Sequence, residues 1–480
     1  MRHIAVIGGG ISGLAAAYYL QKKTTEPISV TLLESGPYWG GKIITHRSDG
    51  FVIEGGPDTF VITKPWGIKL CKELGIYDRL KGTNPKTRKT YILKNDQLHE
   101  LPGGLTMMIP TEIGPMLRTG LLSWPAKARM GFDFFLPPAP DNGDESLGDF
   151  ITRRLGRSAY KNLIEPLMSG IYAGDGDRLS LQSTFPFLRD LEIKHGGLVK
   201  GALALRKQRA ARLQSNVENP SGFGSIFLTP IMGLAEIVEK LVDFLEVSGA
   251  ALNLDSQVKA VMPIPGGYQV HIHSGEVLES DGLILATPPF VSAGLIQEFA
   301  PGLSCELDAI KYVSTATVSM AFRESELPRP LDGYGYVIPR QEGRKALACT
   351  WTSTKFPHRA PPGHALVRVF VGRAGQESEI SWDRDSLLKI ARQELSLTLG
   401  ITAQPLLEKV YIWEDAMPQY NIGHPARLER IQDLCSAMPG LALAGNGYHG
   451  IGIPDCIHSG EIAADRVLES SPVKVNSNLG

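Results

Sequence analysis

The sequence has few cysteines and no arrangement that would pair them or bind a metal. Five cysteines are scattered over 480 residues, without a CxxC motif and without a Cys/His cluster at metal-ligand spacing. This odd, dispersed set argues against a disulfide framework and a structural zinc site, and it favours a reducing compartment. We therefore expect no metal site.

Long apolar runs and a net charge are also missing. No stretch approaches the roughly 18 uninterrupted apolar residues of a membrane-spanning helix, and the glycines that start at Gly8 leave no room for a signal peptide. The 49 basic and 50 acidic residues nearly cancel, so nucleic acid is not expected as a partner. We expect a cytoplasmic protein; peripheral membrane association and the choice between monomer and homodimer stay open.

The N-terminal segment "HIAVIGGGISGLAAAYYLQKK" predicts a strand, a glycine turn and a helix. Its glycines have the spacing G-x-G-x-x-G, which allows a tight turn and close approach of a pyrophosphate to the helix N-terminus. The next strand, "ISVTLLES", ends in an acid that can accept hydrogen bonds from ribose hydroxyls. The sequence therefore predicts a dinucleotide site formed by Gly8, Gly9, Gly10, Ile11, Ser12, Gly13, Glu34 and Ser35.

Two further glycine segments favour FAD over NAD as the dinucleotide. "ESGPYWGGKI" places Gly41 and Lys42 just after the ribose acid, where backbone N–H groups and a cation can reach the diphosphate side. "EGGPDTF" follows a short strand and adds Gly56, Pro57, Asp58 and Thr59. The alternative is two ordinary surface turns, because Gly-Gly pairs are common.

A third glycine segment, "AGNGYHGIGIPDCIHSGEIAADRV", lies near the C-terminus. Its glycines allow the backbone to pass close to a cofactor, and Pro454 and Asp455 suit the start of a helix. We expect Ile451, Gly452 and Ile453 to lie beside the flavin ring. The alternative, a purely structural helix, accounts for the alanines but not for the glycine spacing.

Taken together, these segments resemble the bacterial porphyrinogen oxidases of the monoamine oxidase superfamily, of the Gram-positive type. The most specific matches are "GGKI", "EGGPDTF", "LIEPLMSGIYAGDGDRLSLQSTFP", "WEDAMPQYNIGH" and "AGNGYHGIGIPDCIHSG". The resemblance implies FAD-dependent oxidation of coproporphyrinogen III to coproporphyrin III in haem biosynthesis, in three two-electron steps, with O2 as acceptor and H2O2 as product. Because the flavin abstracts the hydride, no catalytic side chain is assigned.

The resemblance also suggests roles for three single residues. Lys64, in "TFVITKPW", stands where relatives carry a lysine proposed to bind a substrate carboxylate, and a solvated lysine is the alternative. Trp413, in "WEDAMPQY", is expected to pack near the cofactor rather than in an ordinary core. Val258 stands where the adenine side is usually met through backbone atoms, although a plain core valine fits it as well.

The implied fold is α/β: a two-domain FAD-binding Rossmann-like fold with a mixed-sheet substrate domain and a helical insertion. We assign 1–82, 223–300 and 410–470 to the FAD-binding domain, 83–222 to a helical lobe facing substrate or membrane, and 301–409 to the substrate-binding sheet. Residues 471–480 are expected to be a disordered tail. Within the lobe, the segment "MLRTGLLSWPAKARMGFDFFLPP" is a candidate for membrane or substrate contact, with core packing as the alternative for its aromatic residues.

Other functions stay open at this point. Protoporphyrinogen IX oxidase is the first alternative, since the two substrates differ only in two propionates against two vinyl groups. An amine oxidase would carry an acid where Asn446 stands. A non-catalytic flavin or porphyrin carrier would share the same glycine turns.

Overall fold

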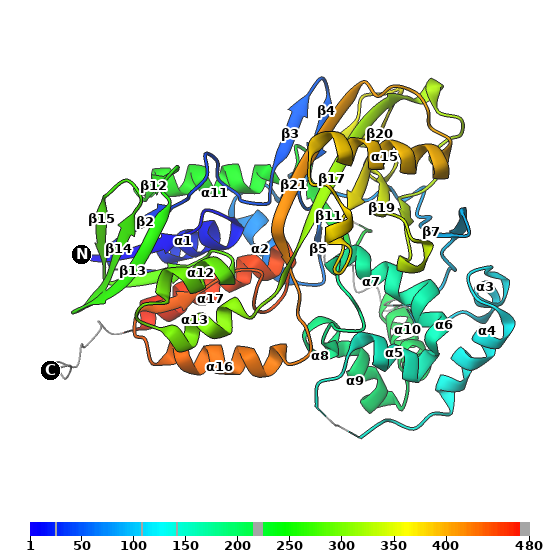
Figure 1. Cartoon of the computed structure of the whole chain (residues 1–480), viewed down its shortest axis with the longest axis horizontal. Helices are drawn as coiled ribbons and strands as arrows, with labels where there is room; N and C mark the ends of the chain where they lie inside the picture. Colours follow the sequence, from blue (N-terminus) through cyan, green and yellow to red (C-terminus); the bar gives the residue numbers. More distant parts are fainter. Residues whose placement is uncertain (25, 107–108, 141–142, 215–223, 471–480) are drawn as a thin grey trace.

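The computed structural model describes residues 1–24, 26–106, 109–140, 143–214 and 224–470, so the tail expected at 471–480 lies outside the described residues. Figure 1 shows a layered nucleotide domain, an upright sheet beside it, and a lobe of helices below that sheet. Among the described residues, no helix combines the length and apolarity that crossing a bilayer requires. The predicted α/β fold with a mixed sheet and a helical insertion is confirmed.

The nucleotide domain is built on a five-stranded sheet in which every pairing is parallel. Its N-terminal strand is buried on both faces, since Ile4 and Val6 pack into one hydrophobic core while Ala5 and Ile7 pack into another. This explains its continuous apolar run. In spatial order the strands are β12 (Ala251–Asn253), β2 (Ile28–Leu33), β1 (Arg2–Ile7), β16 (Gly282–Leu285) and β22 (Leu441–Leu443).

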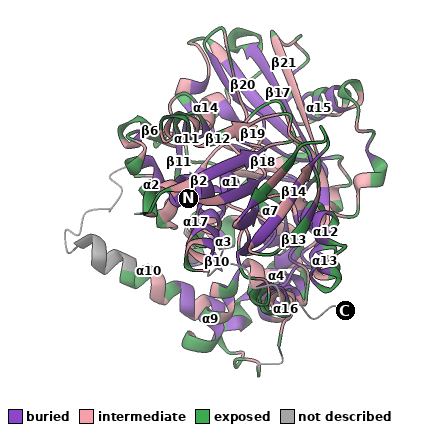
Figure 2. Cartoon of the chain, turned by 90° about the vertical axis from the view of Figure 1, so that its left-hand side faces the viewer, coloured by how far each residue is buried: buried purple, intermediate pink, exposed green. Residues whose placement is uncertain are grey.

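Helices cover one face of this sheet, and a strand meander with more helices covers the other (Figure 1). The first face is covered by α1 (Ile11–Lys23), α2 (Pro65–Glu73), α11 (Ala235–Val247) and α17 (Ile453–Glu469). The second is covered by β13 (Val258–Ile264), β14 (Gly267–Ile272), β15 (Val277–Ser280), α12 (Pro289–Ile296), α13 (Pro301–Asp308) and α16 (His424–Ser436). Figure 2 shows the strands buried and the outward faces of the covering helices exposed.

A seven-stranded mixed sheet forms the second large layer. Its spatial order is β21 (Leu407–Pro418), β17 (Tyr312–Arg323), β20 (His364–Val371), β19 (Ala346–Trp351), β18 (Gly335–Val337), β7 (Tyr91–Lys94) and β8 (Gln97–Glu100). All pairings are antiparallel except that of β18 with β7. The range 83–222, expected to form the helical lobe, therefore also supplies two strands of the sheet, and β21 runs across the expected boundary at 409.

Helix α15 (Arg384–Leu399) covers one face of this sheet. Strand β20 shows the resulting alternation: Val367, Val369 and Val371 pack against the helix side, so Arg368 and Phe370 lie on the opposite face. That opposite face is turned toward the nucleotide domain and forms part of the site described below.

The helical lobe has its own core of buried side chains. Its elements are β9 (Leu105–Thr106), β10 (Ile109–Pro110), α3 (Ile113–Arg118), α4 (Trp124–Gly131), α5 (Leu147–Leu155), α6 (Arg157–Ala159), α7 (Glu165–Tyr172), α8 (Leu181–Thr184), α9 (Pro186–His195) and α10 (Leu198–Gln214). Short strands β3 (Thr45–Ser48), β4 (Phe51–Glu54), β5 (Phe60–Val61), β6 (Leu80–Gly82) and β11 (Phe227–Pro230) link the layers.

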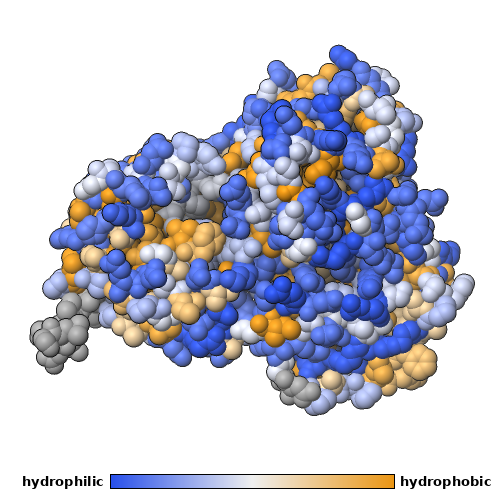
Figure 3. All heavy atoms as spheres, viewed as in Figure 1, coloured by the Kyte–Doolittle hydropathy of each residue, from blue (hydrophilic) through white to orange (hydrophobic). Residues whose placement is uncertain are grey.

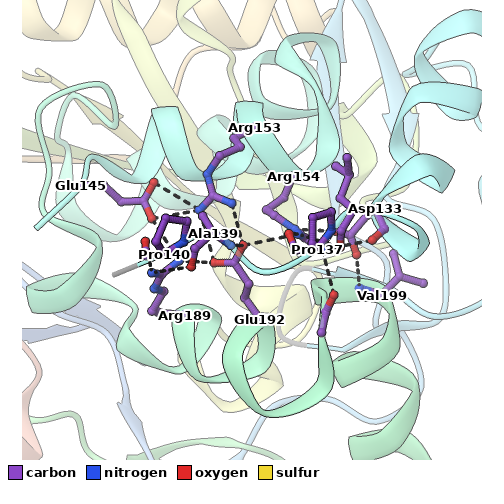
Figure 4. A network of polar contacts seen from close by, with 12 residues as sticks. Asp133, Pro137, Ala139, Pro140, Glu145, Arg153, Arg154, Arg189, Glu192 and Val199 are labelled. Carbon is purple, nitrogen blue, oxygen red and sulfur yellow. Dashed lines mark hydrogen bonds and ion pairs between the residues drawn. The ribbon is translucent and has the colours of Figure 1, made fainter. Parts of the chain in front are cut away.

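A buried ion network fastens the chain between α4 and α5 to the lobe (Figure 4). Arg154 and Asp133 are fully buried and joined by a 2.6 Å contact from Nε to Oδ1. Arg154 also contacts Glu192, which Arg153 and Arg189 approach from the other side. The Asp133 Oδ2 atom accepts a hydrogen bond from the Val199 backbone at 2.7 Å. Because each buried charge has a partner, the network fixes this part of the chain in place.

Candidate active site

The glycine turn between β1 and α1 brings backbone atoms unusually close together. A Cβ on Gly13 would lie 1.9 Å from the carbonyl oxygen of Gly8, so only glycine fits there. Gly10 is the N-cap of α1 and supplies no side-chain hydrogen bond, and the first turn of the helix has no acidic residue. The free N–H groups and the positive end of the helix dipole therefore remain available for an anion.

Glu34 stands at the end of β2, beside this turn. Its two carboxylate oxygens accept hydrogen bonds from the backbone of Gly9 at 2.6 Å and Gly36 at 2.8 Å. These bonds fix the orientation of the carboxylate, whose remaining lone pairs can accept hydroxyl donors. The second glycine segment is locked to the first, because the Gly40 N–H donates to the Gly9 carbonyl at 2.8 Å.

Lys42 follows these glycines, and no acid among the described residues forms an ion pair with it. Its ammonium group donates a hydrogen bond to the Ala416 carbonyl and lies 5.7 Å from the centre of the Tyr312 ring. Loss of water around the group lowers its pKa from 10.5 to about 8. A buried cation whose hydrogen bond goes to a carbonyl suits an anionic ligand.

The glycine segment "EGGPDTF" is held by the seven-stranded sheet. The Gly55 carbonyl accepts hydrogen bonds from Thr317 Oγ1 at 2.8 Å, Trp413 Nε1 at 3.0 Å and Arg368 Nη2 at 3.1 Å. A Cβ on Gly56 would lie 1.9 Å from the Lys42 carbonyl oxygen. These contacts tie the nucleotide domain to the sheet at the point where the two layers meet.

One cavity of about 1000 Å³ connects these segments with the sheet and the helical lobe. It extends from the β1–α1 turn, past the N-terminus of α17, to the α7 residues Gly170 and Ile171. Most of the predicted cofactor-binding residues line it: Gly8, Gly10, Ile11, Ser12, Glu34, Ser35, Gly41, Lys42, Gly56, Pro57, Asp58, Thr59, Val258, Trp413, Ile451, Gly452 and Ile453. The site therefore fits a dinucleotide, with an uncapped helix end, an unpaired cation and an oriented carboxylate along one wall.

Comparison with known proteins agrees with this geometry. A family model for flavin-containing amine oxidoreductases matches residues 11–468. The chain belongs to the flavin-containing amine oxidoreductase family. A coproporphyrinogen III oxidase from Bacillus subtilis is 38% identical over 471 residues, covering 97% of this chain and 98% of the relative. The coproporphyrinogen III oxidase from Staphylococcus aureus is 34% identical over 473 residues, covering 97% and 99%.

A solved structure shows the same fold over nearly the whole chain. It is a crystal structure from Exiguobacterium sp. 255-15, assigned as a protoporphyrinogen oxidase, with a TM-score of 0.84 and 33% identity, covering 97% of this chain and 98% of that one. The predicted cofactor is confirmed: this flavoprotein uses FAD.

Three predicted site residues do not line the cavity. Gly9 and Gly13 lie behind the turn, where Gly9 binds Glu34 and Gly13 packs on Gly8. Lys64 is the N-cap of α2, and its Nζ atom lies 2.5 Å from a carboxylate oxygen of Asp455 in the first turn of α17. Its side chain is 42% exposed. Lys64 therefore stands next to the glycine segment Ile451–Ile453, with a partner from the protein.

Arg368 and Lys355 are two cations that line the cavity on the sheet side and that the sequence motifs do not predict. Lys355 pairs with Asp58 at 3.0 Å. Burial alone would raise the pKa of the Asp58 carboxyl, but Lys355 and Arg368 lower it to about 2. The available signal was the arginine inside the alternating strand pattern "ALVRVFV", which places a charge between Leu366 and Phe370 on a buried face.

The lowered pKa of Lys42 makes FAD binding sensitive to pH. An anionic phosphate near Lys42 favours the charged ammonium, so above pH 8 binding must take up a proton. We expect FAD affinity to be steady below about pH 8 and to fall by up to about tenfold per pH unit above it. Titrating FAD into the apoprotein, followed by flavin fluorescence from pH 6.5 to 9.5, measures this slope.

The matched control is Lys42→Met, which removes the titrating group. This variant should bind FAD more weakly at pH 7 and lose the slope above pH 8. An equal slope in both proteins would show that Lys42 does not face the anionic part of the cofactor.

Proposed function

We propose that this flavoprotein oxidises coproporphyrinogen III to coproporphyrin III in haem biosynthesis, with O2 as the electron acceptor and H2O2 as the second product. The observation that carries the proposal is the continuous cavity, which joins the dinucleotide turn to the sheet face and the helical lobe. The coproporphyrinogen III oxidases at 33–38% identity over nearly the whole chain support this choice of substrate. Plant protoporphyrinogen oxidase is more distant, at 28%.

The walls of the cavity suit a large, mostly apolar ring. Beyond the glycine turns, Ile171, Val337 and Phe370 come from the helical lobe and the sheet. Such side chains exclude water and position a ring by its faces, while FAD, when bound, supplies the hydride acceptor. The protein's own part is then to orient the macrocycle and hold its acidic groups.

Of the described lining side chains, Lys42 has a pKa near neutrality, about 8, and it is assigned above to the anionic part of the cofactor rather than to the substrate. Histidine is absent from the residues that line the cavity. Asp58 is ion-paired with a pKa of about 2, and burial raises the pKa of Cys456 to about 11. The pyrrole N–H protons of the substrate can leave to solvent, so the chemistry does not require a base from the protein.

The proposal is tested by comparing substrates. Porphyrin fluorescence should rise on addition of enzyme, with a greater kcat/KM on coproporphyrinogen III than on protoporphyrinogen IX, and three H2O2 released per porphyrin formed. A greater kcat/KM on protoporphyrinogen would make that compound the substrate. Peroxide release with polyamines alone would indicate an amine oxidase, and binding without acceleration over air oxidation would indicate a carrier.

Lys64 is proposed to hold a propionate of the substrate, in exchange for its contact with Asp455. We expect Lys64→Ala to raise KM for coproporphyrinogen III about fivefold or more while kcat changes less, because only a binding contact is removed. Steady-state kinetics on purified holoenzyme measure both values. Lys69→Ala is the control, since Lys69 lies on the same helix and forms a comparable 2.8 Å ion pair with Glu461 of α17. Equal kinetics for the wild type and Lys64→Ala would remove Lys64 from the site.

The helical lobe carries an exposed group of aromatic side chains beside two lysines, here called the aromatic patch. Figure 3 shows apolar surface at the lower right, where α4 lies in Figure 1. Lys127 Nζ lies 4.7 Å from the Trp124 ring centre, and Lys200 Nζ lies 4.8 Å from that of Phe134. The exposed rings are Trp124 at 67%, Phe132 at 60%, Phe134 at 44% and Phe135 at 78%.

We infer that the aromatic patch rests on an anionic membrane surface. Aromatic rings with neighbouring lysines suit the headgroup region of such a membrane, and the buried Asp133–Arg154 pair holds the patch outward. The protein should sediment with vesicles containing phosphatidylglycerol more than with phosphatidylcholine alone. Substituting Phe132→Ser and Phe135→Ser together should weaken this binding at least about fivefold. Ile462→Ser, at a site 52% exposed on α17, should not. Equal sedimentation of all three proteins would exclude this surface.

A further inference from the structure

Strand β20 places an arginine on the cavity face of the seven-stranded sheet. Strand β20, which carries Arg368, lies between β17 and β19. Thr317 of β17 and Thr350 of β19 line the cavity together with Arg368. The Arg368 side chain is 3% exposed in a strand whose alternate residues form the core beneath α15. An arginine at such a position needs compensation for its lost hydration.

The hydrogen bonds of Arg368 leave part of its guanidinium unused. Its Nη2 atom donates to the carbonyls of Gly55 and Gly56. Its buried Nε atom has no hydrogen-bond partner among the residues that the structure describes. Carbonyls supply partial negative charge only, so the full positive charge is not neutralised by these bonds.

The neighbouring charges do not balance either. Glu54 contacts Arg359 at 2.8 Å, and Asp58 contacts Lys355 at 3.0 Å. In each of these two pairs the acid and the cation have opposite charges that cancel. Arg368 is an additional cation near both carboxylates. The group of five side chains therefore holds three cations and two acids, and three of them, Arg368, Lys355 and Asp58, line the cavity.

We propose that Arg368 and Lys355 form a subsite that binds one carboxylate of the substrate, a role that rests on the proposed porphyrinogen oxidation. The bound carboxylate accepts a hydrogen bond from the Nε–H of Arg368. It also forms an ion pair with Lys355, which keeps its contact with Asp58. The hydroxyls of Thr317 and Thr350 lie on the same face, and Phe370 follows two residues along the strand. A substrate with an apolar ring and acidic groups at its edge matches a wall on which polar side chains lie next to an apolar one.

The subsite is separate from the anion site for FAD. The uncapped end of α1 and Lys42 serve the diphosphate in the nucleotide domain, whereas Arg368 and Lys355 belong to β20 and α14 (Thr352–Lys355) in the sheet domain. Placed at one of the two ring positions that carry propionate in coproporphyrinogen III and vinyl in protoporphyrinogen IX, the subsite sets specificity between these substrates. It adds a contact that two vinyl groups cannot replace.

The test compares three substrates in holoenzyme variants: coproporphyrinogen III, protoporphyrinogen IX, and the tetramethyl ester of coproporphyrinogen III. Arg368→Gln should raise KM for coproporphyrinogen at least about tenfold, with kcat within about threefold and an unchanged ratio of flavin to protein, because a buried charged contact is lost. KM for the uncharged ester should change less than about twofold. Arg392→Gln is the control, since it removes one charge from α15 on the opposite side of the sheet.

The sign of the effect is checked at two neighbouring positions. Lys355→Gln should act in the same direction as Arg368→Gln, and it serves as the second test if Arg368→Gln does not fold. Asp58→Asn should lower KM for coproporphyrinogen, because it removes a carboxylate that competes for the same cations. An equal rise in KM for the acid and the ester overturns the subsite, and so does loss of flavin with an unchanged KM.

Failure of the proposed function is detected separately. If the wild type turns over no porphyrinogen, the proposed reaction is wrong, and the subsite is then tested by binding alone. Quenching of tryptophan fluorescence gives the affinity for coproporphyrin III and for its tetramethyl ester. Weaker binding of the acid alone in Arg368→Gln supports the subsite, and equal affinity in both proteins overturns it.

Discussion

The architecture depends on the close approach of backbone segments around the first turn of α1. Gly13 packs on the carbonyl of Gly8, and the Gly40 N–H bonds to the carbonyl of Gly9. On the other side, a Cβ on Gly460 would lie 2.3 Å from the Ser12 carbonyl, so α17 can cross α1 only with glycine there. Three segments that are distant in the sequence therefore converge on one helix end, and the dipole of that helix faces the cavity.

The second constraint connects this helix end to the sheet. The Gly55 and Gly56 carbonyls accept hydrogen bonds from the sheet side chains Thr317, Trp413 and Arg368. Because these carbonyls belong to the segment that also contacts Lys42, the nucleotide wall and the sheet wall are held in one register. The two walls of the cavity are therefore fixed relative to each other by these hydrogen bonds.

The parts of the site that local spacing determines could be predicted from the sequence. The G-x-G-x-x-G turn, its ribose acid and the helix start at Ile453 each depend on residues near one another in the chain. The cofactor and the fold followed from these together with the family resemblance. The subsite at Arg368 could not be found in this way, because pairing of β20 with β17 and β19 decides which of its residues face the cavity.

Long-range pairing also accounts for the two strands that the sequence placed in the helical lobe. Tyr91 pairs with Tyr336, a contact between residues far apart in the chain, and neither segment alone indicates its partner. Lys64 illustrates the same limit for a single side chain. Its position after the flavin motif is local, but its contact with Asp455 depends on the packing of α2 beside α17.

Lys42 and Arg368 show two ways in which this protein leaves positive charge exposed to a cavity. At Lys42 the described part of the chain supplies no acid, and the loss of water lowers its pKa to about 8. Around Arg368 two acids are supplied for three cations, and Asp58 remains ionised with a pKa of about 2. A cofactor that stays bound while substrates exchange can serve as the counter-ion at the first position. The arrangement around Arg368 suits a substrate that must leave after oxidation. Once the carboxylate has left, Asp58 again balances part of the positive charge.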